Sequence, residues 1–144
     1  MPSLVTERIE SVKAGIVGAG AFAIAELVII LVKTFTITMV VEFSPAAVIV
    51  NWELAFQLAI GAISGFLFGV TYRYIIREDR NSHLNDGAVM AFGLVRGLAL
   101  VEGNLVLSEL LSLGVLIVQS IICFAIARFT IDFAISRKLI KPFI

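Results

Sequence analysis

Three ionisable residues lie within long apolar stretches of this sequence: Glu26, Arg96 and Glu102. A charged side chain near the centre of a membrane helix costs about 2.5–3.5 kcal/mol on insertion scales for Arg, Lys and Asp, and usually faces the bundle interior. A carboxylate held by an arginine can serve as a proton- or ion-coupled site. The same pair can instead fix the register of packed helices. We favour this structural role, because the apolar stretches hold no His or Asp and no helix-breaking proline.

The depths of these residues allow a pair to form. Glu26 lies roughly 18 Å beyond Ala14, where the first apolar run begins, and Arg96 lies roughly 12 Å beyond Ala88. An arginine side chain can cover this difference. Glu102, at roughly 21 Å, is the competing partner near the outer edge. It is about 120° from Arg96 around their common helix, so the two are not expected to pair locally.

Other site chemistry has no support in the sequence. His83 has no second histidine and no cysteine at metal-ligand spacing. Ser64, Ser112 and Ser120 lack a base-and-acid pattern, and no G-x-S-x-G motif occurs. The glycines of residues 15–20 follow no strand and lie inside an apolar run, which argues against a nucleotide loop. We therefore expect no enzymatic activity, no metal and no cofactor.

The residues that position the charged groups form four apolar runs. The chain is 60% hydrophobic, against about 45–50% in soluble domains, even with glycine counted as apolar. A membrane-spanning helix needs about 20 apolar residues. We predict an all-α integral membrane four-helix bundle that forms one domain, with spans at 14–32, 54–76, 88–107 and 110–129. The net charge is zero, so nucleic acid is not an expected partner.

Glycines recur at every fourth position in two of the spans, namely Gly61, Gly65 and Gly69 in the second and Gly93 and Gly97 in the third. Residues four apart share a helix face, and small faces of the GxxxG or glycine-zipper kind allow helices to approach closely in lipid. We predict that these faces contact other helices of the chain, other membrane subunits or a second copy. We also expect the second and third spans to form a close pair that orients the third-span arginine towards the first-span glutamate.

The segment 34–53 is open to three interpretations. The alternation and β-branched residues of 34–39 give a weak strand signal, whereas Ser44–Pro45 is typical of a helix start. We favour an interfacial helix over 45–51, with Trp52 at the headgroup boundary. A strand and a helix extension, with the second helix beginning near Pro45, stay open.

Three further boundaries are predicted from local signals. The sequence Asn85–Gly87 predicts a turn in which Asp86 caps the third helix. The short polar segment 108–109 predicts a tight hairpin between the third and fourth spans. The tail, 128–144, is predicted to be a helical extension into the interface.

Lysine and arginine cluster in three segments that fall on one side of the membrane if there are four spans. The clusters are Arg8 and Lys13; Arg73, Arg77 and Arg80; and Arg128, Arg137, Lys138 and Lys141. The positive-inside rule then places both termini in the cytoplasm or its organellar equivalent. The three central arginines also share a helix face. We interpret them as a topology signal, with contact to anionic lipid or an acidic partner as the alternative.

Two stretches, GFLFGVTYRY at 65–74 and AFGLVRG at 91–97, resemble a family of small integral membrane proteins from cyanobacteria and chloroplasts. The resemblance implies a thylakoid or plasma-membrane location. It carries over no catalytic residue.

These observations predict a small non-catalytic accessory or assembly subunit that packs against a larger membrane complex. The alternative is a proton-coupled transporter that works as a homodimer, with Glu26 as its titrating group. In size, span number and first-span glutamate the chain is similar to small multidrug-resistance transporters. A third hypothesis, lipid binding or membrane shaping, rests only on the central arginines.

Overall fold

The computed structural model describes residues 3–41, 52–75, 82–103 and 110–142, and these ranges form four helices without a strand. The helices are α1 (Leu4–Val41), α2 (Trp52–Ile75), α3 (Ser82–Gly103) and α4 (Leu110–Ser136). Each contains a stretch long and apolar enough to cross a membrane. The predicted all-helical, multi-pass, four-helix architecture is therefore confirmed.

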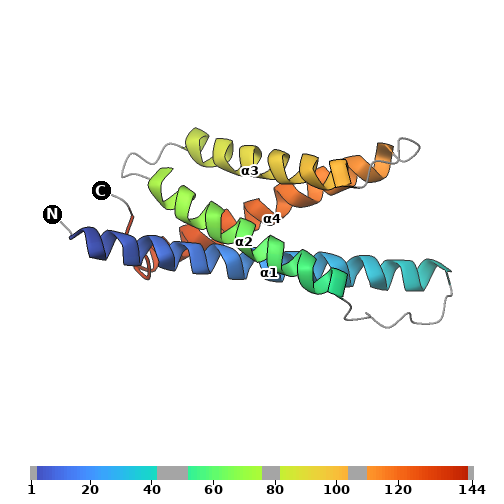
Figure 1. The fold of residues 1–144 in the computed structure, drawn as a ribbon, viewed down its shortest axis with the longest axis horizontal. Coiled ribbons are helices and arrows are strands. Elements are labelled where there is room, and N and C mark those ends of the chain that lie inside the picture. The colour runs from blue at the N-terminus through green and yellow to red at the C-terminus, as the bar shows by residue number, and fades with distance from the viewer. Residues whose placement is uncertain (1–2, 42–51, 76–81, 104–109, 143–144) are drawn as a thin grey trace.

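The helices pack as two pairs, α1 with α2 and α3 with α4, and α4 also crosses α1 (Figure 1). Both chain termini lie at one end of the bundle (Figure 1). We call this the terminal end and the opposite one the distal end. The helix limits at the terminal end are Leu4, Ile75, Ser82 and Ser136, and those at the distal end are Val41, Trp52, Gly103 and Leu110.

One phenylalanine from each helix meets in the centre of the bundle. The rings of Phe22 and Phe124 lie 4.7 Å apart between centroids, and Phe68 lies 5.2 Å from Phe124 and 5.3 Å from Phe92. These are favourable separations for tilted and edge-to-face ring pairs. Because lipid supplies no hydrophobic drive between helices, close ring packing is one of the forces that hold the four together.

Helix α1 is longer than the span predicted for it and continues to Val41. The strand signal at 34–39 was wrong, because α1 continues through this segment. The hydroxyls of Thr34 and Thr36 donate to the carbonyls of Ile30 and Val32, at 2.9 and 2.8 Å, so these polar side chains are satisfied within a helix. The interfacial helix predicted at 45–51 lies outside the described residues.

The turn predicted at Asn85–Gly87 is absent, because α3 already begins at Ser82. Asp86 is therefore an internal helix residue rather than a cap, and its carboxylate pairs with Arg128 of α4. The ion pair with Arg128 stabilises Asp86 in a helix more than the local sequence favours a turn. The segment 108–109, where a tight hairpin turn was predicted, lies outside the described residues.

The helical extension predicted over 128–144 is confirmed as far as Ser136 and is wrong for 137–142, the described residues beyond it. Lys138 adopts a left-handed conformation with φ of 60°. Its amide donates to Ile135 at 3.0 Å, and the Leu139 amide donates to Ala134 at 2.9 Å. This is the Schellman pattern, which usually has glycine at the left-handed position. The chain then turns back and buries Ile140.

Candidate functional site

The carboxylate of Glu26 in α1 lies inside the bundle, with 2% of the residue exposed. Its Oε1 accepts from Arg96 Nη2 of α3 at 3.2 Å and from Gln57 Nε2 of α2 at 3.3 Å. Arg96 also donates from Nη1 to Ser64 Oγ at 3.3 Å, and its guanidinium lies 5.1 Å from the centroid of the Phe22 ring. We call Glu26, Arg96, Gln57 and Ser64 the central site. It joins α1, α2 and α3 through one buried ion pair.

The second carboxylate oxygen, Glu26 Oε2, is buried and has no hydrogen-bond partner. It packs against Gly61, where a Cβ atom would overlap it. Glycine at this position therefore leaves the space that the carboxylate occupies. A buried carboxylate oxygen without a donor is costly, so Oε2 is the unsatisfied polar atom of the central site.

The central site depends on how α3 is placed against α4. Gly93 and Gly97 flank Arg96 in sequence and lie against Ile121 and Ile117 of α4, where a Cβ atom would come within 2.7 Å. We expected these glycines to face the second span, but they face the fourth. The Arg96 side chain therefore reaches Glu26 of α1 from a helix that packs mainly on α4.

The glycines of α2 lie against α1. A Cβ atom at Gly65 would come 2.5 Å from the carbonyl oxygen of Gly18, and one at Gly69 would overlap the carbonyl of Ala14. The two backbones thus approach so closely that no side chain fits between them.

Glu102 was predicted to compete with Glu26 for Arg96. It is exposed near the end of α3 and belongs to none of the ion pairs among the described residues.

Arg73 at the terminal end is fully buried, with 0% exposed. It donates to Glu7 Oε2 at 2.7 Å, to Ser11 Oγ at 2.8 Å and to the carbonyl of Lys141 at 2.9 Å. Glu10 Oε2 in turn accepts from the Lys141 amide at 2.8 Å. These five residues, which we call the terminal clasp, tie the start of α1, the end of α2 and the returning tail together.

The terminal clasp differs from the surface role that the sequence suggested for Arg73. Its guanidinium faces protein groups, so it is not available to a lipid headgroup in this structure. The other two central arginines, Arg77 and Arg80, lie outside the described residues.

A second polar network at the terminal end connects the remaining helices. Tyr72 in α2 donates its hydroxyl to Asp132 Oδ1 in α4 at 2.7 Å. Arg128 Nε lies 3.6 Å from Asp132 Oδ2, and the same guanidinium pairs with Asp86 of α3. Together with the clasp, this network fastens all four helices at one end.

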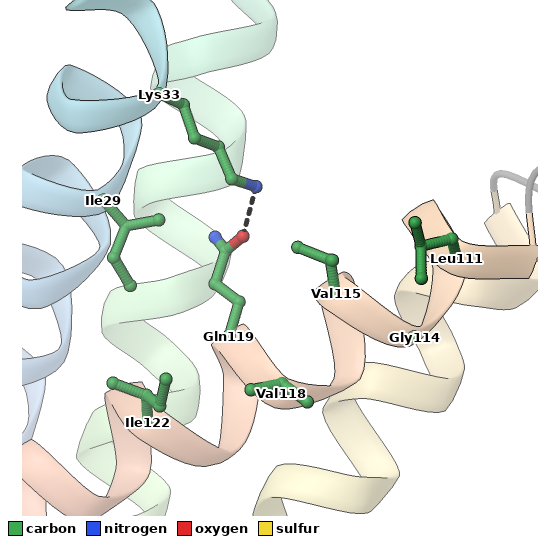
Figure 2. A pocket seen from close by; sticks show the side chains of 8 residues that line it. All are labelled: Ile29, Lys33, Leu111, Gly114, Val115, Val118, Gln119 and Ile122. Atoms are coloured by element: carbon green, nitrogen blue, oxygen red, sulfur yellow. Dashed lines mark hydrogen bonds between the residues drawn. The ribbon is translucent and has the colours of Figure 1, made fainter. Parts of the chain in front are cut away.

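At the distal end Lys33 of α1 donates to Gln119 Oε1 of α4 (Figure 2). This bond spans one side of a cavity of about 510 Å³ between the two helices. The remaining lining is apolar and is contributed by Ile29, Leu111, Gly114, Val115, Val118 and Ile122. We call this space the distal cavity.

A second cavity of about 520 Å³ lies nearer the terminal end of the same α1–α4 seam. Gly20 is one of the residues that line it, and a Cβ atom there would meet nothing within 4 Å. Ile16, Ile24 and Ile126 line its sides. We call this space the seam groove.

The sequence did not predict the polar partners Gln57, Gln119 and Asp132. Each is a polar residue in a largely apolar stretch, and this was the signal that could have identified it. Within the described ranges no three His, Cys, Asp or Glu side chains come together as metal ligands would. The one cysteine, Cys123, is buried, and His83 is exposed.

Comparison with family models, with curated proteins and with solved structures finds no match to this chain. The inference of function therefore rests on the geometry of the bundle.

Proposed function

We propose that the protein is a non-catalytic accessory or assembly subunit that packs against a larger complex in a plasma or thylakoid membrane. One observation carries the proposal: Gly20 lies uncovered beneath the seam groove. Gly18, Gly65 and Gly93 are in contact with a neighbouring helix or its side chains, whereas Gly20 and Gly114, which both line cavities of the α1–α4 seam, meet nothing within 4 Å. By the same packing rule, a helix from another chain would cover Gly20.

The surroundings of Gly20 support a helix as the occupant. Ala21 and Ala25 also line the groove, so the α1 side has small residues where a second backbone would approach. Ile16 and Ile24 are 61% and 66% exposed and flank this strip. Small residues between larger apolar ones are the usual surface for close helix contact in lipid.

The proposal includes the topology and the packing faces that the sequence predicted. Both ends would lie on the cytoplasmic or stromal side, as the distribution of lysine and arginine indicates. Gly61, Gly65 and Gly69 would serve as the face for α1, and Gly93 and Gly97 as the face for α4. The shared position of the two termini in Figure 1 supports this arrangement.

A crosslinking experiment in native membranes tests the proposal. A photoreactive residue at Ile24, within the seam groove, is expected to capture one discrete partner subunit, whereas the same residue at Val95, exposed on α3, should not. Gly20→Leu should abolish the capture, because it fills the groove. Gly87→Leu is the matched control, since a Cβ at Gly87 also meets nothing within 4 Å. Capture that survives Gly20→Leu, or no capture at Ile24, would contradict the proposal.

A second candidate function is proton-coupled transport by a homodimer. The unpartnered Glu26 Oε2 favours it, because intramembrane carboxylates that face a bundle interior are typical of proton relays. Proton-coupled flux should then appear on reconstitution and disappear with Glu26→Gln. Glu102→Gln, the same change at an exposed carboxylate outside the central site, is the control. Absence of flux from the unmodified protein, or flux unchanged by Glu26→Gln, rules this candidate out.

A further inference from the structure

The distal cavity combines an apolar wall with hydrogen-bond donors at one side. In Figure 2 the side chains of Val115, Val118 and Ile122 on α4 lie across from Ile29 on α1, and Lys33 reaches over the space between the helices. Apolar walls with a few convergent polar groups are the usual composition of a ligand site. This description fits a molecule with an apolar body and a polar head.

The polar groups of the cavity favour a negatively charged head. An ammonium group only donates, so the oxygen of Gln119 must face Lys33, and the amide nitrogen of Gln119 points the other way (Figure 2). Gln119 is only 9% exposed. None of the ion pairs among the described residues includes Lys33. A negatively charged head group would therefore complement this ammonium.

The packing register places Lys33 at the depth of lipid headgroups. The carboxylate of Glu26 on α1 lies against Gly61 on α2, and the two helices run in opposite directions. Two turns further along each helix, Lys33 is level with Leu54, where the apolar stretch of α2 begins. Trp52, an exposed aromatic of the kind that lies at the membrane boundary, is two residues beyond.

We propose that the distal cavity binds an anionic phospholipid, with its phosphate against Lys33 and an acyl chain along the α1–α4 seam. A bilayer brings a negatively charged phosphate to this depth and apolar chains to the wall below it. This site does not depend on the accessory-subunit proposal, because it concerns the isolated bundle.

Native mass spectrometry of the purified protein in neutral detergent tests the site. Added phosphatidylglycerol should remain on the protein as one bound lipid, and phosphatidylcholine should bind about tenfold more weakly. Lys33→Gln should reduce phosphatidylglycerol binding by about tenfold, and Lys33→Arg should retain it. Lys138→Gln, at an exposed lysine of the terminal end, is the matched control and should have no effect.

A second variant keeps the proposal falsifiable if Lys33→Gln fails to fold. Val118→Trp fills the distal cavity from its exposed α4 wall and should displace the lipid without removing a charge. The proposal would be overturned if the two lipids bound equally, or if inorganic phosphate alone occupied the site in place of the lipid. It would also be overturned if lipid binding were unchanged in both Lys33→Gln and Val118→Trp. Capture of a partner helix at Val115, rather than a lipid, would also overturn it.

Discussion

The two ends of the bundle are held together in different ways. At the terminal end, a fully buried arginine and a tyrosine–aspartate–arginine network join all four helices and the tail. Among the described residues of the distal end, one bond between Lys33 and Gln119 bridges α1 and α4 beside a cavity. Charged groups in this molecule therefore stabilise one end, and at the other they border a space that a ligand can enter.

The central site lies between the two ends and shares features of both. Its ion pair is buried like the terminal clasp, but Glu26 Oε2 has no partner, whereas both carboxylate oxygens of Glu10 are engaged. A buried pair is retained at a desolvation cost that good geometry and further hydrogen bonds must offset. The terminal clasp meets this condition, and the central site meets it only in part.

The largest loss of stability is expected from a substitution in the terminal clasp. Arg73→Leu would leave Glu7 and the Lys141 carbonyl without their buried donor, so we expect the free energy of unfolding to fall by about 3–5 kcal/mol. Denaturant unfolding in detergent micelles, followed by circular dichroism, measures this. Lys33→Leu, the same kind of change at the distal end, should cost at most about 1 kcal/mol. Equal losses from the two variants would remove the distinction between the ends.

The next effect is on the close contact of α1 and α2. Gly65→Leu places a side chain where the Gly18 carbonyl and the Phe22 side chain already lie, so the helices must separate. Overpacking of this kind costs about 1–3 kcal/mol. The thermal midpoint in detergent should fall, whereas Gly87→Leu, directed into open space, should leave it nearly unchanged. A Gly65→Leu protein as stable as its parent would mean that this face is not in contact with α1.

A smaller effect is expected at the central site. Glu26→Gln leaves the Arg96 guanidinium without its carboxylate, and Arg96→Met leaves the carboxylate without its cation. Each should cost about 1–3 kcal/mol. The double variant should lose clearly less than the two single losses combined, because each group is costly only when its partner is missing. Strict additivity in this cycle would show that the pair is not energetically coupled.

Much of the fold could be predicted because apolar length is a direct requirement of a membrane span. The four helices follow from it, although α1 and α3 begin earlier than the predicted runs, at Leu4 and Ser82. Local signals were less informative where a distant residue supplied a partner. The sequence around Asp86 is typical of a turn, but Asp86 lies within a helix and pairs with Arg128. Helix α4 is followed by a left-handed lysine, Lys138, where a glycine would have predicted the helix end.

The central site could be predicted in part for the same reason. Glu26 and Arg96 were identified because charges are rare at membrane depth, and the structure brings them together. The helix against which Gly93 and Gly97 pack could not be predicted, since a small face does not specify its neighbour. Arg73 resembled a topology signal, because burial of an arginine by a returning tail depends on contacts more than sixty residues apart.

The most direct test of the contrast between the two ends is a pair of spin-label distance distributions in lipid nanodiscs. The labels would be placed at Leu31 and Leu111 for the distal end and at Ile9 and Leu139 for the terminal end, all of them exposed, with Cys123 replaced by alanine. We predict a narrow distribution for the terminal pair and a broader one for the distal pair. A terminal distribution as broad as the distal one, or broader, would contradict the conclusion that the bundle is fastened at one end.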